Sequence, residues 1–431
     1  MLITQQRRGR PNLTHQRHGL LPWPASSPIS NFGVCHVRSY STRLVAVLIK
    51  ARTAVKYRVC SLGVAAALTL TVSGILAAGP SRAADSVTTI PILLNAVSSQ
   101  SASEAWAVGS QDTHTALVLR WNGARWTKVA SPNPGGASGT TSLFDVRAVS
   151  PASAWAVGLY QRVGAVAHTL VLRWNGSTWK QMPSPNPGAQ GGMLIGVSAT
   201  SASNAWAVGD YIDQTGAPKT LTLHWDGTRW TRVSSPNPGP GFAGLSAVSI
   251  VSRSDAWAVG FFDLVGLTQR TLLMHWNGTA WKPAIYPGCD GVLSDVSASS
   301  ASNAWAVGNC STGPVALHWN GTSWTRITVP APAGARNSLL FGVSSLSASQ
   351  AWAVGYYNTP AIIQQTLVLH WDGSRWMQVP SPNPGGHNNS ALVDVSARSS
   401  SDAWAVGNID SAHASELTLV LHWDGTSWSQ A

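Results

Sequence analysis

Short apolar segments separated by turn residues run through residues 92–431, in an order that recurs seven times. Every repeat contains Ala-Trp-Ala-Val-Gly, in which Trp and Val alternate with Ala, so the large side chains share one face of a strand and the small ones the other. A Leu-x-Leu-(His/Arg)-Trp segment or a close variant follows, and an Asn-Gly or Asp-Gly pair, a strong hairpin signal, then leads to another Trp. The Trp of the first segment is Trp106, Trp155, Trp206, Trp257, Trp305, Trp352 and Trp404.

The length of the repeat predicts the architecture. Successive Ala-Trp-Ala-Val segments lie 47–52 residues apart, and each repeat divides into four strand-like pieces. Four short strands in about 50 residues are typical of a propeller blade. We therefore predict an all-β fold, a seven-bladed β-propeller of four-stranded antiparallel blades over residues 85–431. The last repeat ends soon after Trp428, so residues 85–91 could complete its fourth strand from the N-terminal side.

Some distances within the repeat are fixed and others vary. The second-strand Trp lies nine residues after the first-strand Val in every repeat, and the third- and fourth-strand Trp are always five apart. The second-to-third-strand distance ranges from 14 to 19 residues, and the fourth-to-first-strand distance from 15 to 20. In an antiparallel blade the two fixed connections share one end, here called the turn face, and the two variable ones share the other, the loop face. Variable loops on a rigid scaffold favour binding at the loop face, although drift in unconstrained loops would give the same pattern.

Aromatic and acidic residues outside the repeated framework gather on the predicted loop face, just after the second strand. Exposed Tyr and Asp are typical of sugar or peptide recognition. The alternative is that the rings cap the ends of the blade core. The candidate binding residues are Tyr160, Tyr211, Asp213, Phe262, Tyr356 and Tyr357.

Two cysteines, Cys289 and Cys310, fall within the repeats, and both lie on the loop face where the two loops are shortest. An even pair in an exported protein indicates a disulfide. We predict that this bond replaces the loop packing that is missing there.

The formal charge of +11 belongs to the N-terminal segment. Residues 1–84 carry eleven Lys and Arg and no acid, whereas residues 85–431 carry 17 basic and 17 acidic residues, which argues against nucleic-acid binding. Lys56 and Arg58 precede an apolar run over residues 59–78, and a small-residue cleavage site follows at residues 81–83. We expect residues 1–54 to be an unstructured extension or an artefact of the assigned start, and residues 55–84 to be a signal peptide. The mature protein would be secreted, with no stable membrane anchor.

No catalytic motif recurs in register, and we expect no catalytic residue, no cofactor and no metal site. The His of the Leu-His-Trp segments recurs once per blade, with Arg120 and Arg173 in the same position, which favours a framework hydrogen bond over a metal site. Asp145, Asp295 and Asp394 share the position before the first-strand Val and could approach the axis. They leave open a glycoside hydrolase or lyase, because that chemistry needs two carboxylates about 5–9 Å apart.

The Trp-Ala-Val-Gly strand and the (Asn/Asp)-Gly-x-x-Trp turn resemble those of exported bacterial β-propeller repeat proteins. The turn is similar to neuraminidase (Asp-box) repeats and to photosystem II assembly-factor-type propellers, and more distantly to kelch and galactose-oxidase-like propellers. The Asp-box reads Ser-x-Asp-x-Gly-x-x-Trp, whereas the turn at Asp424 is one residue shorter and has His422 in place of the Ser. The catalytic residues of sialidases and of galactose oxidase have no identifiable counterparts, so the resemblance implies a fold and no particular activity.

These observations together predict a secreted, monomeric, non-catalytic binding or scaffold module. Its loop face would recognise a glycan, a cell-wall polysaccharide or an extracellular protein.

Overall fold

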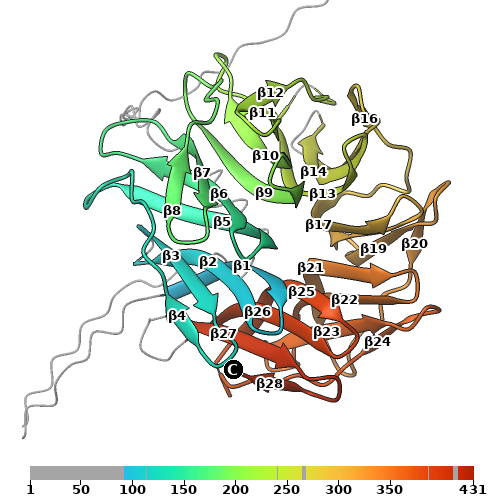
Figure 1. Ribbon diagram of the computed structural model, residues 1–431. Coiled ribbons are helices and arrows are strands. Elements are labelled where there is room, and N and C mark those ends of the chain that lie inside the picture. Colours follow the sequence, from blue (N-terminus) through green and yellow to red (C-terminus); the bar gives the residue numbers. More distant parts are fainter. Residues whose placement is uncertain (1–91, 113, 240, 265–267, 387, 411–415) are drawn as a thin grey trace, which may run out of the picture. The chain divides into compact units, whose positions relative to one another are not determined.

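The computed structural model describes residues 92–431, except residues 113, 240, 265–267, 387 and 411–415. The expected extension (1–54), signal peptide (55–84) and closing segment (85–91) lie outside the described residues. The described strands form seven four-stranded antiparallel sheets arranged around an axis, which confirms the seven-bladed β-propeller (Figure 1). Within the described part of the chain, no helix has the length and apolar character needed to cross a membrane.

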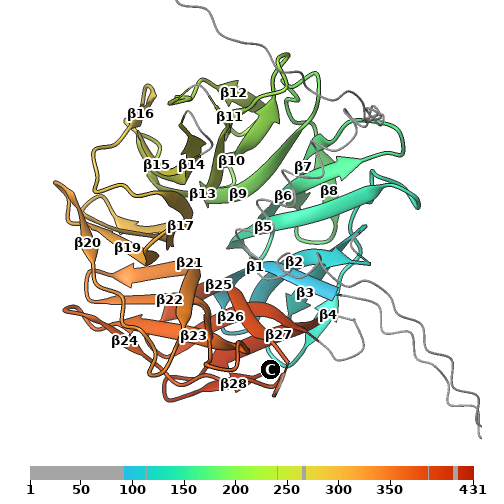
Figure 2. The ribbon, with the colours of Figure 1, turned by 180° about the vertical axis from the view of Figure 1, so that it is seen from behind.

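Each blade is one repeat, with its first strand nearest the axis and its fourth at the periphery (Figures 1 and 2). Blades 1 to 4 are β1 (Ile92–Ser101), β2 (Glu104–Gln111), β3 (Thr115–Trp121) and β4 (Trp126–Lys128); β5 (Thr140–Ser150), β6 (Ser153–Gln161), β7 (His168–Trp174) and β8 (Trp179–Met182); β9 (Gly192–Ser201), β10 (Asn204–Ile212), β11 (Pro218–Trp225) and β12 (Trp230–Val233); β13 (Ala243–Ser252), β14 (Asp255–Asp263), β15 (Gln269–Trp276) and β16 (Trp281–Pro283).

Blades 5 to 7 follow the same order. They are β17 (Gly291–Ser300), β18 (Asn303–Cys310), β19 (Gly313–Trp319) and β20 (Trp324–Ile327); β21 (Asn337–Ser347), β22 (Gln350–Asn358), β23 (Gln364–Trp371) and β24 (Trp376–Gln378); β25 (Ser390–Ser399), β26 (Asp402–Asp410), β27 (Glu416–Trp423) and β28 (Trp428–Gln430).

The Gly of Ala-Trp-Ala-Val-Gly is required by the close approach of the first strand. A Cβ on Gly109 would lie 1.8 Å from the carbonyl oxygen of Leu93, and one on Gly355 would lie 1.9 Å from that of Leu339. The first strand has a register shift beside this contact in every blade, as between Leu94 and Ala96 in blade 1. Only Gly lacks the Cβ that would clash at this bulge.

The second-strand Trp of each blade packs against the next blade. The ring of Trp106 lies 4.9 Å from that of Trp174 and 5.0 Å from that of Trp179. The other six second-strand Trp make the same pair of contacts, and all seven are at most 3% exposed. The contact with the fourth-strand Trp is edge-on, an arrangement that the aromatic quadrupole favours. Each blade interface is therefore built on three Trp rings.

Blade 7 meets blade 1 through the same contacts without a peptide linker between them. Trp404 packs on Trp121 at 4.9 Å and on Trp126 at 5.1 Å. The Asp394 carboxylate accepts a hydrogen bond from the backbone N–H of Val97 at 2.8 Å. The outer strand of blade 7 is β28, so the C-terminal end of the chain supplies that blade's own fourth strand.

Candidate functional site

The structure places the variable connections at one end of the blades. On the turn face, every first-to-second-strand connection has two residues, such as 102–103, and every third-to-fourth-strand connection has four, such as 122–125. On the loop face, the second-to-third-strand connections range from two residues (311–312) to six (162–167), and the fourth-to-first-strand connections from seven (284–290) to eleven (129–139). The loop face is therefore the end at which the blades differ.

Structural hydrogen bonds occupy the turn face. The side chain of Asn122 accepts bonds from the N–H groups of Ala124 and Arg125, at 3.0 Å each, and the same pattern recurs in all seven blades. Three blades carry Asp in this position: Asp226, Asp372 and Asp424. In each, the hydroxyl of the Ser or Thr two residues later and the backbone N–H groups donate to the carboxylate, and these bonds lower its pKa to about 2. These carboxylates are committed to the turns.

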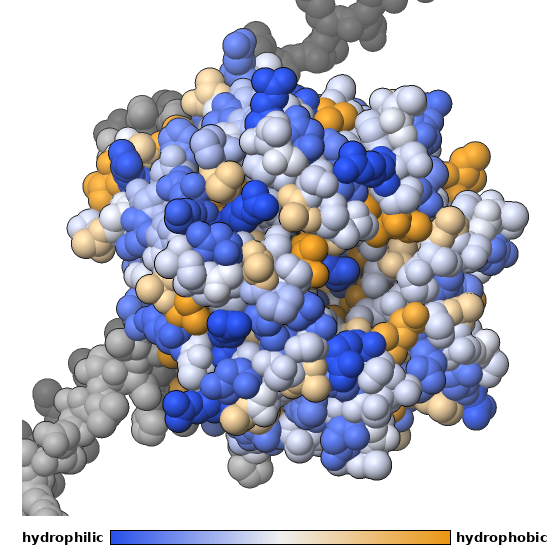
Figure 3. Space-filling model, in the orientation of Figure 1, coloured by the Kyte–Doolittle hydropathy of each residue, from blue (hydrophilic) through white to orange (hydrophobic). Residues whose placement is uncertain are grey.

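Exposed large apolar side chains are concentrated on the loop face. Among the described residues, seven such side chains are exposed, and six of them lie in or beside the loop-face connections: Val163, Val166, Leu264, Ile285, Ile362 and Leu417. The seventh, Met377, is the middle residue of β24, the outer strand of blade 6. On the face of the molecule drawn in Figure 3, apolar residues are scattered among hydrophilic ones and form no single broad patch.

The loop of blade 6 presents Ile362 in a strained backbone conformation. Ile362 is 65% exposed and has a φ of 64°, a value that β-branched residues rarely adopt. The loop is held by bonds from the N–H of Thr359 to the Ile363 carbonyl and from the N–H of Ile362 to the Thr359 carbonyl, each at 2.9 Å. Strain held by surrounding bonds is a common feature of functional loops.

Four of the candidate binding residues occupy one position, two residues after the second-strand Gly: Tyr160, Tyr211, Phe262 and Tyr357. All four are half-buried and pack against the cluster that joins their blade to the preceding one. Tyr160 stacks on His168 at 5.3 Å, and the Arg232 guanidinium lies 4.4 Å over the Tyr211 ring while donating a hydrogen bond to its hydroxyl. Groups of the same blade therefore cover part of the Tyr160 and Tyr211 rings.

Tyr356 corrects the sequence-based assignment, because its side chain is only 1% exposed. It lies one residue after the second-strand Gly, and the alternation of a strand turns it away from the position that Tyr357 occupies. Its ring packs 5.8 Å from that of Phe341, and burial raises the pKa of its hydroxyl. Tyr356 is a core residue and cannot form part of a surface site.

Asp213 lies in the loop between β10 and β11, where it organises the chain. Its Oδ1 accepts hydrogen bonds from the hydroxyl and N–H of Thr215, at 2.6 and 2.8 Å, and from the N–H of Ala217 at 3.0 Å. The bond from the Thr215 hydroxyl contributes most to the lowered pKa of this carboxyl. Asp213 therefore shapes its loop.

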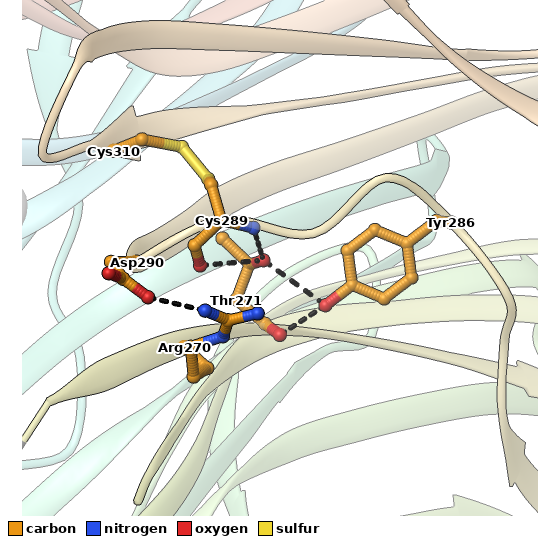
Figure 4. Close-up of a disulfide and its surroundings, with 6 residues drawn as sticks. All are labelled: Arg270, Thr271, Tyr286, Cys289, Asp290 and Cys310. Atoms are coloured by element: carbon orange, nitrogen blue, oxygen red, sulfur yellow. Dashed lines mark hydrogen bonds and ion pairs between the residues drawn. A yellow bond between two sulfur atoms is a disulfide. The ribbon is translucent and has the colours of Figure 1, made fainter.

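The structure contains the predicted disulfide between Cys289 and Cys310 (Figure 4). Cys310 holds the position that carries an aromatic ring in blades 2, 3, 4 and 6, and Cys289 belongs to the connection between blades 4 and 5. Figure 4 also shows Arg270 paired with Asp290 at 2.6 Å beside the bond. The disulfide thus fastens the shortest fourth-to-first-strand connection to the blade that follows it.

Three of the four Ser-Pro-Asn-Pro-Gly connections dock on a Thr of the third strand, whereas in the first the Asn133 side chain accepts the Thr141 hydroxyl of the next blade at 2.5 Å. In blade 2 the N–H of Thr169 donates to Asn186 Oδ1 at 2.7 Å, and the hydroxyls of Thr169 and Ser184 lie 2.7 Å apart. Blades 3 and 6 repeat this arrangement. In blade 4, Thr271 binds the Tyr286 hydroxyl and the N–H of Cys289 instead. The repeated motif is therefore a structural clamp.

The inner-strand carboxylates join neighbouring blades. Asp145 Oδ1 accepts the N–H of Val146 at 2.8 Å, and its Oδ2 accepts that of Val197 in the next blade at 2.7 Å. Asp295 and Asp394 repeat both bonds. Charge-assisted bonds of this kind hold the inner strands together. The three carboxylates therefore have a structural role at the blade interfaces.

The third-strand His residues belong to the framework. The His224 ring lies 4.6 Å from that of Trp206, and its Nε2 lies 3.0 Å from Asn204 Oδ1. His275, His318 and His422 make equivalent bonds, and Arg120 takes the place of His in blade 1 by pairing with Glu104. Within the part of the chain that the structure describes, no group of three or more His, Cys, Asp or Glu residues could hold a metal ion.

No family model and no curated protein matches this chain. Among solved structures, it is similar to YCF48 from Cyanidioschyzon merolae, with 14% identity, a TM-score of 0.48 and coverage of 78% of this chain and 96% of that one. A structure of YCF48 bound to D1 peptide matches with 14% identity and a TM-score of 0.43, over 68% of this chain and 81% of that one. A fucose-specific lectin from Aleuria aurantia matches with 10% identity and a TM-score of 0.39, over 65% and 91%. These similarities assign no ligand to this chain.

Proposed function

We propose that residues 92–431 form a non-catalytic module that binds a protein partner through the loop face, in a protein exported from the cell. The observation that carries the proposal is the gathering of exposed aliphatic side chains there, led by Ile285 at 97%, Val163 at 74% and Ile362 at 65%. Burial of these side chains against another protein would remove their apolar surface from water, at about 25 cal/mol per Å².

A glycan is the second candidate ligand, and the covering of two aromatic rings weighs against it. Sugar recognition uses the open face of an aromatic ring, whereas Tyr160 and Tyr211 are half-buried and partly covered by His168 and Arg232. Since the exposed apolar groups of the loop face are aliphatic, the geometry favours a protein partner.

Affinity capture with matched variants tests the proposal. The immobilised protein is incubated with extracellular and cell-surface proteins of the source cells, and retained proteins are quantified by mass spectrometry. The combined variant Val163→Ser, Ile285→Ser and Ile362→Ser removes three loop-face anchors, and Met377→Ser removes an exposed apolar side chain from the outer strand of blade 6. At about 1 kcal/mol for each anchor, the triple variant should bind its partner at least a hundredfold more weakly, while Met377→Ser binds like wild type.

A polysaccharide array run in parallel separates the two ligand classes. Equal retention of every protein by wild type and the triple variant would refute the proposal. Array binding that survives the triple change but is lost in Tyr211→Ala would establish a glycan ligand instead.

A further inference from the structure

The residue directly after the second-strand Gly can fasten one blade to the next. In blade 5 this residue is Asn309, whose Nδ2 donates to the Leu340 carbonyl at 2.8 Å while its Oδ1 accepts the Leu340 N–H at 2.9 Å. In blade 7, Asn408 makes the same two bonds with Leu94, at 3.3 and 3.1 Å. An amide suits this position because it presents one donor and one acceptor to a backbone that presents one of each.

Blade 3 has Asp210 in the same position. Its side chain is fully buried, and neither carboxyl oxygen has a hydrogen-bond partner among the described residues. It lies beside Gly244 of blade 4, where a Cβ would be 3.3 Å from the Phe261 ring and 3.8 Å from the Asp210 Cβ. Burial raises the pKa of the Asp210 carboxyl to about 7. A buried carboxylate without a partner is costly, which explains the direction of the shift.

The strands around Asp210 supply no compensating charge. β9 and β13 carry no titratable residue. On β11, Lys219 pairs with Tyr211 and its Nζ donates to the Gly241 carbonyl, in the connection to blade 4, at 3.5 Å, while His224 lies at the turn-face end. On β14, Asp255 lies at the turn-face end, and Asp263 at the loop-face end is itself a carboxyl whose pKa is raised by burial.

We propose that Asp210 is a protonation-controlled latch between blades 3 and 4. In the described part of the structure neither Asp210 oxygen has a partner. Once protonated, the carboxyl turns toward Leu245, so that its O–H donates to the Leu245 carbonyl and its other oxygen accepts the Leu245 N–H, in the pattern of the Asn amides of blades 5 and 7. When the proton passes to water, the carboxylate keeps two acceptors and no donor, so it repels the Leu245 carbonyl. The loop-face end of this one interface then loosens, while the Asn-latched interfaces stay closed.

Two reciprocal variants test the latch. Asp210→Asn fixes the protonated hydrogen-bond pattern, and Asn309→Asp installs a titrating carboxyl at the interface between blades 5 and 6. Wild-type protein at pH 5 should show the infrared carbonyl band of a protonated carboxylic acid, which disappears near pH 7 and is absent from Asp210→Asn. Hydrogen exchange, corrected for its intrinsic pH dependence, should become faster above pH 7 in β10 and β13 of the wild-type protein. In Asn309→Asp it should become faster in β18 and β21 as well. In Asp210→Asn it should become faster at neither interface.

Stability gives an independent measure with a defined sign. Because the pKa of the Asp210 carboxyl is higher in the folded state than the usual 3.8, the folded protein holds this proton more tightly than the unfolded chain does. The contribution of Asp210 to the free energy of unfolding therefore falls as pH rises from about 4 to about 7 and is level above that. The melting temperature of Asp210→Asn should exceed that of wild type by an amount that grows to about 5 °C over this window. Asp210→Ser, which copies Ser110 of blade 1, serves as a second variant that fits the position.

Parallel pH profiles for wild type and both Asp210 variants would overturn the proposal. Persistence of the protonated-acid band in Asp210→Asn would overturn it as well, because the band would then belong to another carboxyl.

Discussion

The interface between blades 7 and 1 offers a direct test of how the ring holds together. Trp404 is 1% exposed and lies 4.9 and 5.1 Å from the rings of Trp121 and Trp126, whereas Trp257 makes equivalent contacts at 5.0 Å each inside the continuous chain. Burial of about 150–250 Å² at about 25 cal/mol per Å² gives about 4–6 kcal/mol gross for either ring. Truncation to Ala should therefore cost about 3–5 kcal/mol at both positions.

Thermal unfolding and hydrogen exchange distinguish the two sites. With an unfolding entropy of about 2.1 cal/mol/K per residue over about 340 residues, this loss lowers the melting temperature by about 4–7 °C in each variant. Exchange should accelerate in β1 and β25–β26 for Trp404→Ala but in β13–β14 and β17 for Trp257→Ala. If Trp404→Ala cost less than about 1 kcal/mol while Trp257→Ala cost the full amount, the ring would not be closed in solution by the contacts described above.

Three further changes probe the framework. Asp394→Ala removes two bonds of 2.8 Å to backbone N–H groups and should cost about 2–4 kcal/mol by urea unfolding. A smaller loss than in Asn358→Ala, which removes one side-chain bond to Asn337 within blade 6, would contradict the bridging role. Replacing Cys289 and Cys310 together by Ser should lower stability by about 2–4 kcal/mol, with no further effect of reductant on the variant. Arg147→Ser should raise stability by about 1 kcal/mol, because the Ser in this position of the other six blades bonds to the next blade, and an unchanged melting temperature would show that no such bond forms.

The fold could be predicted because its signals are local and repeated seven times. The alternation in Ala-Trp-Ala-Val fixes which way each side chain faces, and the fixed Asn-Gly spacing fixes the hairpins. The pairing of Cys289 with Cys310 could be predicted because they are the two cysteines within the repeats. The same alternation would have separated Tyr356 from Tyr357, since adjacent strand residues face opposite sides.

Other features depend on residues from a neighbouring blade, which the pattern of one repeat does not contain. Asp145 becomes structural only because the N–H of Val197 lies within reach, and Asp210 is buried beside Gly244 of blade 4. Alignment of the seven repeats would have singled out Asp210, because it occupies the position of Asn309 and Asn408. The exposure of Ile362 likewise depends on a loop conformation that its residue type disfavours.

Because every described blade is completed by its own repeat, the position of the chain ends is not tied to the architecture. The junction between blades 7 and 1 has the same ring contacts and carboxylate bridge as junctions that a linker crosses. A circular permutant that joins residue 431 to residue 92 through a short linker and opens the chain between two other blades should therefore fold to the same ring. By the same reasoning, unequal crossing-over within the gene would add or remove whole blades without dividing a sheet.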